Sequence, residues 1–330
     1  MDMESLNLLS GNNTKKVAGQ YEGQQTFCSK KTTWFGVVVL VIVVLVGYLV
    51  FMPSAPVASS ASQIQSVECN SYSREREPTV LIYNRVPKAG SSSMTNLLSK
   101  LSSKHGFKML GWFDLPSHDY DAVEKAVNDA LKRGKKTVIA QHFHFPEIIN
   151  ENVAYINVVR EPVSRCTSQY YYLRYGDRKE EDRKKVLDKY GDLTIDECID
   201  TGAYDSCFNC DGFKQSLFFC GRDGGPCKTY KPNDILDRAK RTIDSHYTVG
   251  AIEDFEGTVA VMEKLYPSFF KGGLELLKKV KPQRVTQGVT KEYIKPSNAS
   301  RDVIQDLLKQ DVELYDYVVN KLEHLKQCLL

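Results

Sequence analysis

Short apolar runs rich in β-branched residues alternate along the chain with stretches in which apolar residues recur at helical spacing. The runs typical of buried strands are 79–83, 108–113, 137–140, 154–159 and 247–252. Helical spacing is found around 94–101, from Asp121 to Gly134, after Pro162, at 255–265 and at 303–325. This alternation predicts an α/β fold with a mostly parallel sheet.

A different apolar segment, 34–52, carries no charge over about 19 residues, enough for one helix to cross a bilayer. Four lysines precede it, and the next charge is Glu68, which favours a cytoplasmic N-terminus. A cleaved signal peptide would be shorter and nearer the start, and a buried core helix would be less rich in valine. The pattern predicts a type II protein with this organisation: a cytoplasmic tail (1–33), a transmembrane signal anchor (34–52), a flexible stem (53–76) and a folded domain (77–330).

Composition narrows the functional classes. The 330-residue chain has a net charge of only +3, which argues against nucleic acid as a partner. Five of its nine cysteines lie between Cys198 and Cys227, and outside the cytoplasm this density favours disulfides. Cys207-x-x-Cys210 invites a zinc interpretation, but no second pair completes such a site.

The first predicted strand leads through Pro87, Lys88 and Gly90 into three serines and a helix. Free N–H groups and the positive end of a helix dipole favour an anion at such a loop. Lys88 would add a full charge, although it precedes the glycine and so departs from the P-loop pattern. The alternative is an ordinary strand-to-helix turn.

Two more sets of polar residues follow strand ends. His142 and His144 come after 137–140 and, if extended, project to one face, where an imidazole suits a general base. A structural or metal-binding pair is the alternative. Arg160 and Ser168 form a second candidate anion site, unless Arg160 only pairs with Glu161 at the surface. Because parallel strands end at one edge, these groups could share a crevice that binds a nucleotide with phosphates at both ends.

Together these stretches resemble the Golgi uronosyl 2-O-sulfotransferases, a family that includes the heparan sulfate enzyme and its chondroitin/dermatan relative. The matching stretches are 83–93, 142–144, 155–162, 170–177, 196–198, 218–221 and 249–250. The likeness extends from about Thr79 to near the C-terminus, with the pieces in the same order and at the same spacing.

The resemblance implies a sulfotransferase fold that uses 3′-phosphoadenosine 5′-phosphosulfate (PAPS) and no metal. Lys88, His142 and His144 would be catalytic. The residues that would bind the cofactor are Lys88, Ala89, Gly90, Ser91, Ser92, Arg160, Ser168, Arg284 and Thr286. The residues that would face the polysaccharide are Arg85, Asn96 and some of Arg174, Arg178 and Arg183.

The resemblance also implies a Golgi membrane protein with a lumenal catalytic domain, a glycosaminoglycan substrate and a homotrimer that involves the C-terminal segment. It implies the disulfides Cys198–Cys207 and Cys220–Cys227 and leaves Cys210 without a partner. Asn298-Ala-Ser300 fits a lumenal glycosylation site. The chain departs from the heparan enzyme at Ala89-Gly90 and Gln169, and the acidic run 180–182 interrupts an expected basic surface.

These implications predict that one histidine takes the proton from a uronic acid 2-hydroxyl while Lys88 and the loop stabilise the departing phosphate. Heparan and chondroitin/dermatan acceptors both remain open. An alternative from another class is a catalytically silent glycosaminoglycan-binding membrane protein on the same fold. A kinase is disfavoured because no catalytic-loop Asp/Asn set is apparent.

Overall fold

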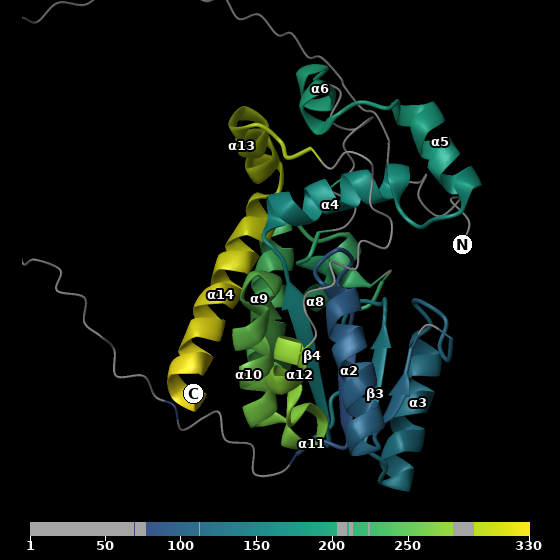
Figure 1. Ribbon diagram of the computed structural model, residues 1–330, viewed down its shortest axis with the longest axis vertical. Helices are drawn as coiled ribbons and strands as arrows, with labels where there is room; N and C mark the ends of the chain where they lie inside the picture. Colours follow the sequence, from purple (N-terminus) through teal and green to yellow (C-terminus); the bar gives the residue numbers. More distant parts are fainter. Residues whose placement is uncertain are drawn as a thin grey trace, which may run out of the picture. The chain divides into compact units, whose positions relative to one another are not determined.

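The computed structural model describes residues 77–111, 113–202, 214–223, 225–279 and 294–330, together with Cys69 and Cys210 (Figure 1). The predicted tail, anchor and nearly all of the stem lie outside these residues. Within the described ranges, no helix is both long enough and apolar enough to cross a bilayer. The organisation predicted for the N-terminal segments therefore stays a prediction.

Five parallel strands form one sheet in the order β2-β3-β1-β4-β5. Their bounds are β1 Val80–Asn84, β2 Lys108–Leu110, β3 Thr137–Gln141, β4 Val153–Val159 and β5 Tyr247–Ala251. The predicted α/β fold with a parallel sheet is confirmed. The strand expected at 108–113 is shorter, because the chain turns at Gly111, whose N–H donates to the Asp114 carboxylate at 2.9 Å.

Helices cover both faces of the sheet, because each face buries its own apolar cluster. On one face the sheet packs against α3 (Tyr120–Arg133), α9 (Pro232–His246) and α14 (Lys309–Leu329). On the other it packs against α2 (Ser91–His105), α10 (Phe255–Leu265), α11 (Pro267–Phe270) and α12 (Gly273–Lys279), as Figure 1 shows.

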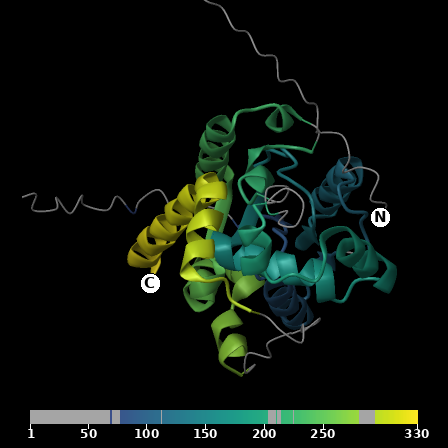
Figure 2. The same ribbon diagram turned by 90° about the horizontal axis from the view of Figure 1, so that it is seen from above.

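A smaller helical layer lies beyond the carboxyl ends of the strands (Figures 1 and 2). It contains α4 (Pro162–Tyr175), α5 (Glu180–Tyr190), α6 (Ile195–Asp200) and α13 (Asn298–Leu307). Val163, Tyr170, Ile195 and Ile304 are buried in a third apolar cluster that joins α4, α6 and α13. This layer covers the strand ends where the predicted site residues lie.

Two helix predictions need correction. The helix predicted at 303–325 is broken at Leu308, which is fully buried between α13 and α14. The helix expected from Asp121 begins at Tyr120, and its N-cap is Asp119, whose carboxylate accepts the N–H of Ala122 at 2.9 Å. Gly134 ends α3, as predicted, and it adopts a left-handed conformation there.

Disulfides close loops of very different length in this domain. The structure pairs Cys69 with Cys328, Cys166 with Cys210, and Cys220 with Cys227. Cys198 is also disulfide-bonded, and its partner lies outside the described residues, as does the predicted partner Cys207. Cys210, which the family resemblance left unpaired, therefore has a partner. The described residues contain no group suited to a metal ion.

Candidate active site

The loop between β1 and α2 ends in a helix N-terminus, as the sequence predicts. Lys88 and Gly90 both adopt left-handed backbone conformations, with φ of 62° and 82°. Gly90 is the N-cap of α2, and its residue type is required because a Cβ there would lie 2.3 Å from Cδ1 of Ile252. The first N–H groups of α2 have no partner within the helix, so they remain available to a ligand.

Two cations converge on this loop. A guanidinium nitrogen of Arg160, which follows β4, donates to the Lys88 carbonyl at 3.2 Å. The Lys88 ammonium lies 3.8 Å from the centre of the Tyr172 ring. Burial and the charge of Arg160 lower the pKa of Lys88 to about 8, with Asp177 acting in the opposite direction. A site that disfavours its own positive charge in this way is prepared for an anion.

Arg160 is held by the chain around it. Its N–H donates to Oε1 of Gln215 at 3.0 Å, and Nε2 of Gln215 donates to its carbonyl at 2.8 Å. Asp311 on α14 accepts the N–H of Gln215 at 2.7 Å and both the N–H and the hydroxyl of Ser216. The strand end that carries Arg160 is thus fixed to the C-terminal helix.

The start of α4 does not supply free N–H groups near Arg160. The Glu161 carboxylate caps this helix, accepting the N–H groups of Val163 and Ser164 at 3.0 and 2.8 Å. The anion site at this end therefore relies on the Arg160 side chain and on the hydroxyl predicted for it, that of Ser168. Ser168 is half-buried on α4, further along from Arg160. Arg284 and Thr286 lie outside the described residues.

Both predicted histidines lie just beyond β3, and they alternate with buried aromatic residues as an extended segment should. Phe143 and Phe145 are in the core, while His142 and His144 are half-buried. His142 Nδ1 donates to the carbonyl of Arg85 at 2.9 Å, so His142 is adjacent to the end of β1. Burial and the nearby charge of Arg85 lower the pKa of His142 to about 4.

His144 has a different environment. Its Nδ1 lies 2.6 Å from an oxygen of Asp223, and its ring meets the Phe218 ring edge-on at 4.6 Å. Asp223 also contacts His118. A cavity of about 520 Å³ adjoins this cluster, lined by Ser117, His118, Asp119, Tyr120, Asp121 and Arg222. The imidazole of His144 is thus paired with a carboxylate beside an open cavity.

A buried amide network under the strand ends fixes these positions. Gln141 accepts the N–H of His142 at 2.7 Å and donates to the carbonyl of Leu115 at 2.8 Å. Asn157 donates to Asn84 from the neighbouring strand, and Asn84 donates to the carbonyl of Phe218 at 2.8 Å. All three amides are fully buried, which makes their hydrogen bonds costly to break.

The expected polysaccharide-facing residues separate into two groups. Arg85 is at the site, where it donates to the Ser91 hydroxyl at 3.4 Å, and Asn96 is exposed on α2. Arg174 is only 2% exposed and stacks on the Tyr170 ring at 3.6 Å, so it lies in the interior and not on an acceptor surface. Arg178 and Arg183 are half-buried, and Arg183 donates to the Gly176 carbonyl at 3.0 Å.

Four residues of the site were not predicted from the sequence: Asp223, His118, Gln215 and Asp311. Each acts from a segment far from its partner in the sequence, so hydrophobic periodicity carries no signal for them. Only Asp223 is marked by a sequence signal, because it lies between the two cysteines of a predicted disulfide.

The chain is similar in sequence to known sulfotransferases. The profile of the Sulfotransferase family matches residues 75–318. Human heparan sulfate 2-O-sulfotransferase 1 is 28% identical over 264 residues, covering 76% of this chain and 73% of that protein. Mouse uronyl 2-sulfotransferase is 28% identical over 272 residues, covering 76% and 64%.

A solved structure of retinol dehydratase with androsterone and the inactive cofactor PAP covers 76% of this chain and 83% of its own, at 11% identity and a TM-score of 0.23. The family profile spans most of the folded domain, including the loop at Lys88, both histidines and Arg160. The chain therefore belongs to the sulfotransferase family.

Proposed function

We propose that the protein transfers the sulfonate group of PAPS to the 2-hydroxyl of a uronic acid, iduronate or glucuronate, in a glycosaminoglycan. The observation that carries the proposal is the convergence of Lys88 and Arg160, joined by a hydrogen bond of 3.2 Å, at the strand edge that also bears His142 and His144. Family membership and the names of the two relatives support the same reaction.

The residues present fit an adenosine bisphosphate. The Lys88 ammonium, the Arg160 guanidinium, the hydroxyls of Ser91 and Ser92 and the N-terminus of α2 form a set of donors suited to phosphate and sulfonate oxygens. When bound, PAPS supplies an activated sulfonate. Lys88 would neutralise the negative charge that grows on the leaving phosphate, and the α2 N–H groups would add preorganised donors.

The two histidines are not equivalent as bases. Both hold Nδ1 in a hydrogen bond, which leaves Nε2 free to accept a proton. The low pKa of His142 makes it a weak base near neutral pH. The Asp223 carboxylate would stabilise His144 once it is protonated. We therefore assign proton removal from the sugar hydroxyl to His144.

The proposed location is the Golgi membrane, with the domain in the lumen. Support comes from the disulfides, because such bonds persist in the secretory pathway and are rare in the cytosol. Asn298 is exposed at the start of α13, where a glycan could be attached. A homotrimer built through the C-terminal segment remains part of the proposal.

The test is sulfonate transfer by the detergent-solubilised full chain, from labelled PAPS to desulfated heparin and to dermatan, followed by disaccharide analysis. We expect label on the 2-position of the uronic acid in at least one acceptor. Lys88→Ala and His144→Ala should each abolish transfer, while Lys104→Ala, an exposed lysine on the same helix as the serines, should not. Acceptor binding without any transfer would favour the silent binding protein.

A further inference from the structure

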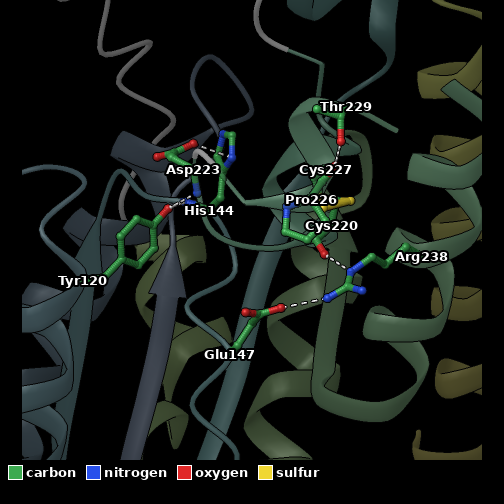
Figure 3. The surroundings of a disulfide bond; sticks show 9 residues. All are labelled: Tyr120, His144, Glu147, Cys220, Asp223, Pro226, Cys227, Thr229 and Arg238. Atoms are coloured by element: carbon green, nitrogen blue, oxygen red, sulfur yellow. Dashed lines mark hydrogen bonds and ion pairs between the residues drawn. A yellow bond between two sulfur atoms is a disulfide. The ribbon is translucent and has the colours of Figure 1, made fainter. Parts of the chain in front are cut away.

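A small disulfide-closed loop reaches the candidate base. Cys220 and Cys227 are bonded, and Asp223 lies between them in the chain (Figure 3). Arg238 on α9 anchors the start of this loop, donating to the Cys220 carbonyl at 2.6 Å and pairing with Glu147 at 2.8 Å. The loop is thus attached to the segment that follows His144.

Each Asp223 oxygen meets a different imidazole. Oδ1 lies 2.6 Å from Nδ1 of His144, and Oδ2 contacts Nδ1 of His118. The Tyr120 hydroxyl oxygen accepts the N–H groups of Asp223 at 2.8 Å and of His144 at 3.2 Å (Figure 3). One phenol therefore fixes the spacing of the two backbones whose side chains meet.

The carboxylate stays ionised in this setting. Burial alone would raise the pKa of Asp223, but the hydrogen bonds with His118 and His144 outweigh it and hold the pKa well below its usual range. An ionised carboxylate can only accept hydrogen bonds, so the proton of neutral His144 must reside on Nδ1. The Phe218 ring, 4.6 Å away, limits rotation of the imidazole.

We infer that Asp223 is a positioning residue that holds His144 in the tautomer with a free Nε2 and stabilises the imidazolium formed when His144 takes the sugar proton. This inference rests on the proposed function. The proton moves from the hydroxyl to Nε2, the Nδ1–H stays on His144, and Asp223 remains a carboxylate throughout. His118, held by the other oxygen, keeps the carboxylate aligned.

A structural role predicts something different. If Asp223 only tied the disulfide loop to the neighbouring loop, its replacement would change folding and affinity and leave the pH dependence of turnover unchanged. The charged and titratable groups near the pair include His118, Tyr120 and Arg222. Asp119 and Asp121 line the same cavity, and His142 interacts with the charge of His118. All of them are retained in the variants below.

The experiment compares Asp223→Asn with the wild-type full chain, using PAPS and the better acceptor. We expect kcat to fall by about 10- to 1000-fold, within what a general base contributes. The KM for acceptor and the affinity for adenosine 3′,5′-bisphosphate should change by less than about twofold. Losing the negative charge should also move the acid limb of the kcat profile to lower pH.

Asp223→Glu should recover part of the rate and return the acid limb towards its wild-type position. The matched control is Asp129→Asn, which neutralises an exposed carboxylate elsewhere on the surface and should leave rate and profile unchanged. A wild-type kcat in Asp223→Asn overturns the inference. So does a reduced kcat with an unmoved acid limb and no recovery in Asp223→Glu.

A second measurement needs neither a folded Asp223 variant nor activity. Nitrogen-15 NMR of histidine-labelled wild-type protein reports which ring nitrogen of neutral His144 carries the proton, with His144→Gln identifying the signal. We expect protonated Nδ1 and bare Nε2, and the opposite tautomer overturns the inference. If the wild type transfers no sulfonate, the proposed function fails. The NMR measurement would still test whether Asp223 sets the tautomer of His144.

Discussion

Gln215 grips the main chain of Arg160 with both ends of its side-chain amide, accepting the Arg160 N–H at 3.0 Å and donating to its carbonyl at 2.8 Å. Gln215 is itself held by fully buried Asp311 on α14. The orientation of a candidate phosphate-binding arginine thus depends on the C-terminal helix. Deleting that helix should therefore disturb the nucleotide site as well as the core.

Gln215→Ala should weaken the binding of adenosine 3′,5′-bisphosphate. Without the amide, the Arg160 backbone loses two partners, and part of the binding energy is then used to order the strand end again. We expect the Kd to rise by about tenfold, equivalent to one or two lost hydrogen bonds of about 1 kcal/mol each. Titration calorimetry measures this, and Gln305→Ala, at an exposed position of α13, is the matched control. An unchanged Kd would show that the clamp does not matter for the nucleotide.

Gly90→Ala should displace the anion loop. Its φ of 82° already costs an alanine about 1 kcal/mol, and its Cβ would lie 2.3 Å from Ile252. Gly106→Ala is a close control, because Gly106 has a φ of 74° at the other end of α2, and the methyl group of an alanine there would meet nothing within 4 Å. Urea unfolding should show a lower free energy of unfolding for both variants than for the wild type. Nucleotide affinity should fall in Gly90→Ala alone. Equal nucleotide affinity in the two variants would contradict the role given to this loop.

The pKa of Lys88 predicts that nucleotide affinity depends on pH. Below its pKa of about 8 the ammonium is charged, and above that value it becomes neutral. Phosphate groups are already largely ionised above pH 7, so they do not offset this loss. The Kd for adenosine 3′,5′-bisphosphate should therefore rise by up to about tenfold between pH 7 and pH 9. Lys88→Arg keeps its charge and should flatten the dependence, and an equally steep profile in that variant would assign the titration to another group.

Sequence patterns predicted the sheet well, because strands such as β1 and β4 are continuous apolar runs and must be buried on both faces. They also predicted that Lys88, His142 and Arg160 lie at one edge of the sheet, because the carboxyl ends of parallel strands lie together. They failed for two charged residues whose roles depend on burial and helix capping, which hydrophobic periodicity does not report. Arg174 is charged, yet its flat guanidinium stacks on Tyr170 in the interior. Glu161 is next to Arg160 in sequence, yet it caps α4.

Cysteine pairing marks another limit. Cys166–Cys210 and Cys69–Cys328 close loops of very different length, with separations of 44 and 259 residues. Spacing along the chain cannot choose among the many pairings of nine cysteines, because only the folded backbone brings the right sulfurs together. The ion pair of Asp223 and His144 could not be predicted for the same reason. Asp223 nevertheless lies inside the predicted Cys220–Cys227 disulfide, and His144 was itself a predicted site residue.

His142 should make the folded domain less stable in mild acid. Its pKa is about 4 in the folded protein and about 6.5 in an unfolded chain, so between these values only the unfolded state takes up the proton. The contribution of His142 to the free energy of unfolding is therefore fully present above pH 6.5 and decreases as the pH falls. Below pH 4 it decreases no further, because His142 is then protonated in both states. The contribution from His142 amounts to about 2 kcal/mol between pH 7 and pH 5. Urea unfolding followed by circular dichroism should show that His142→Gln lacks this part of the decline, while its offset from the wild type stays constant between pH 7 and pH 8. Parallel curves down to pH 5 would mean that the imidazole is hydrated enough to be protonated in the folded state.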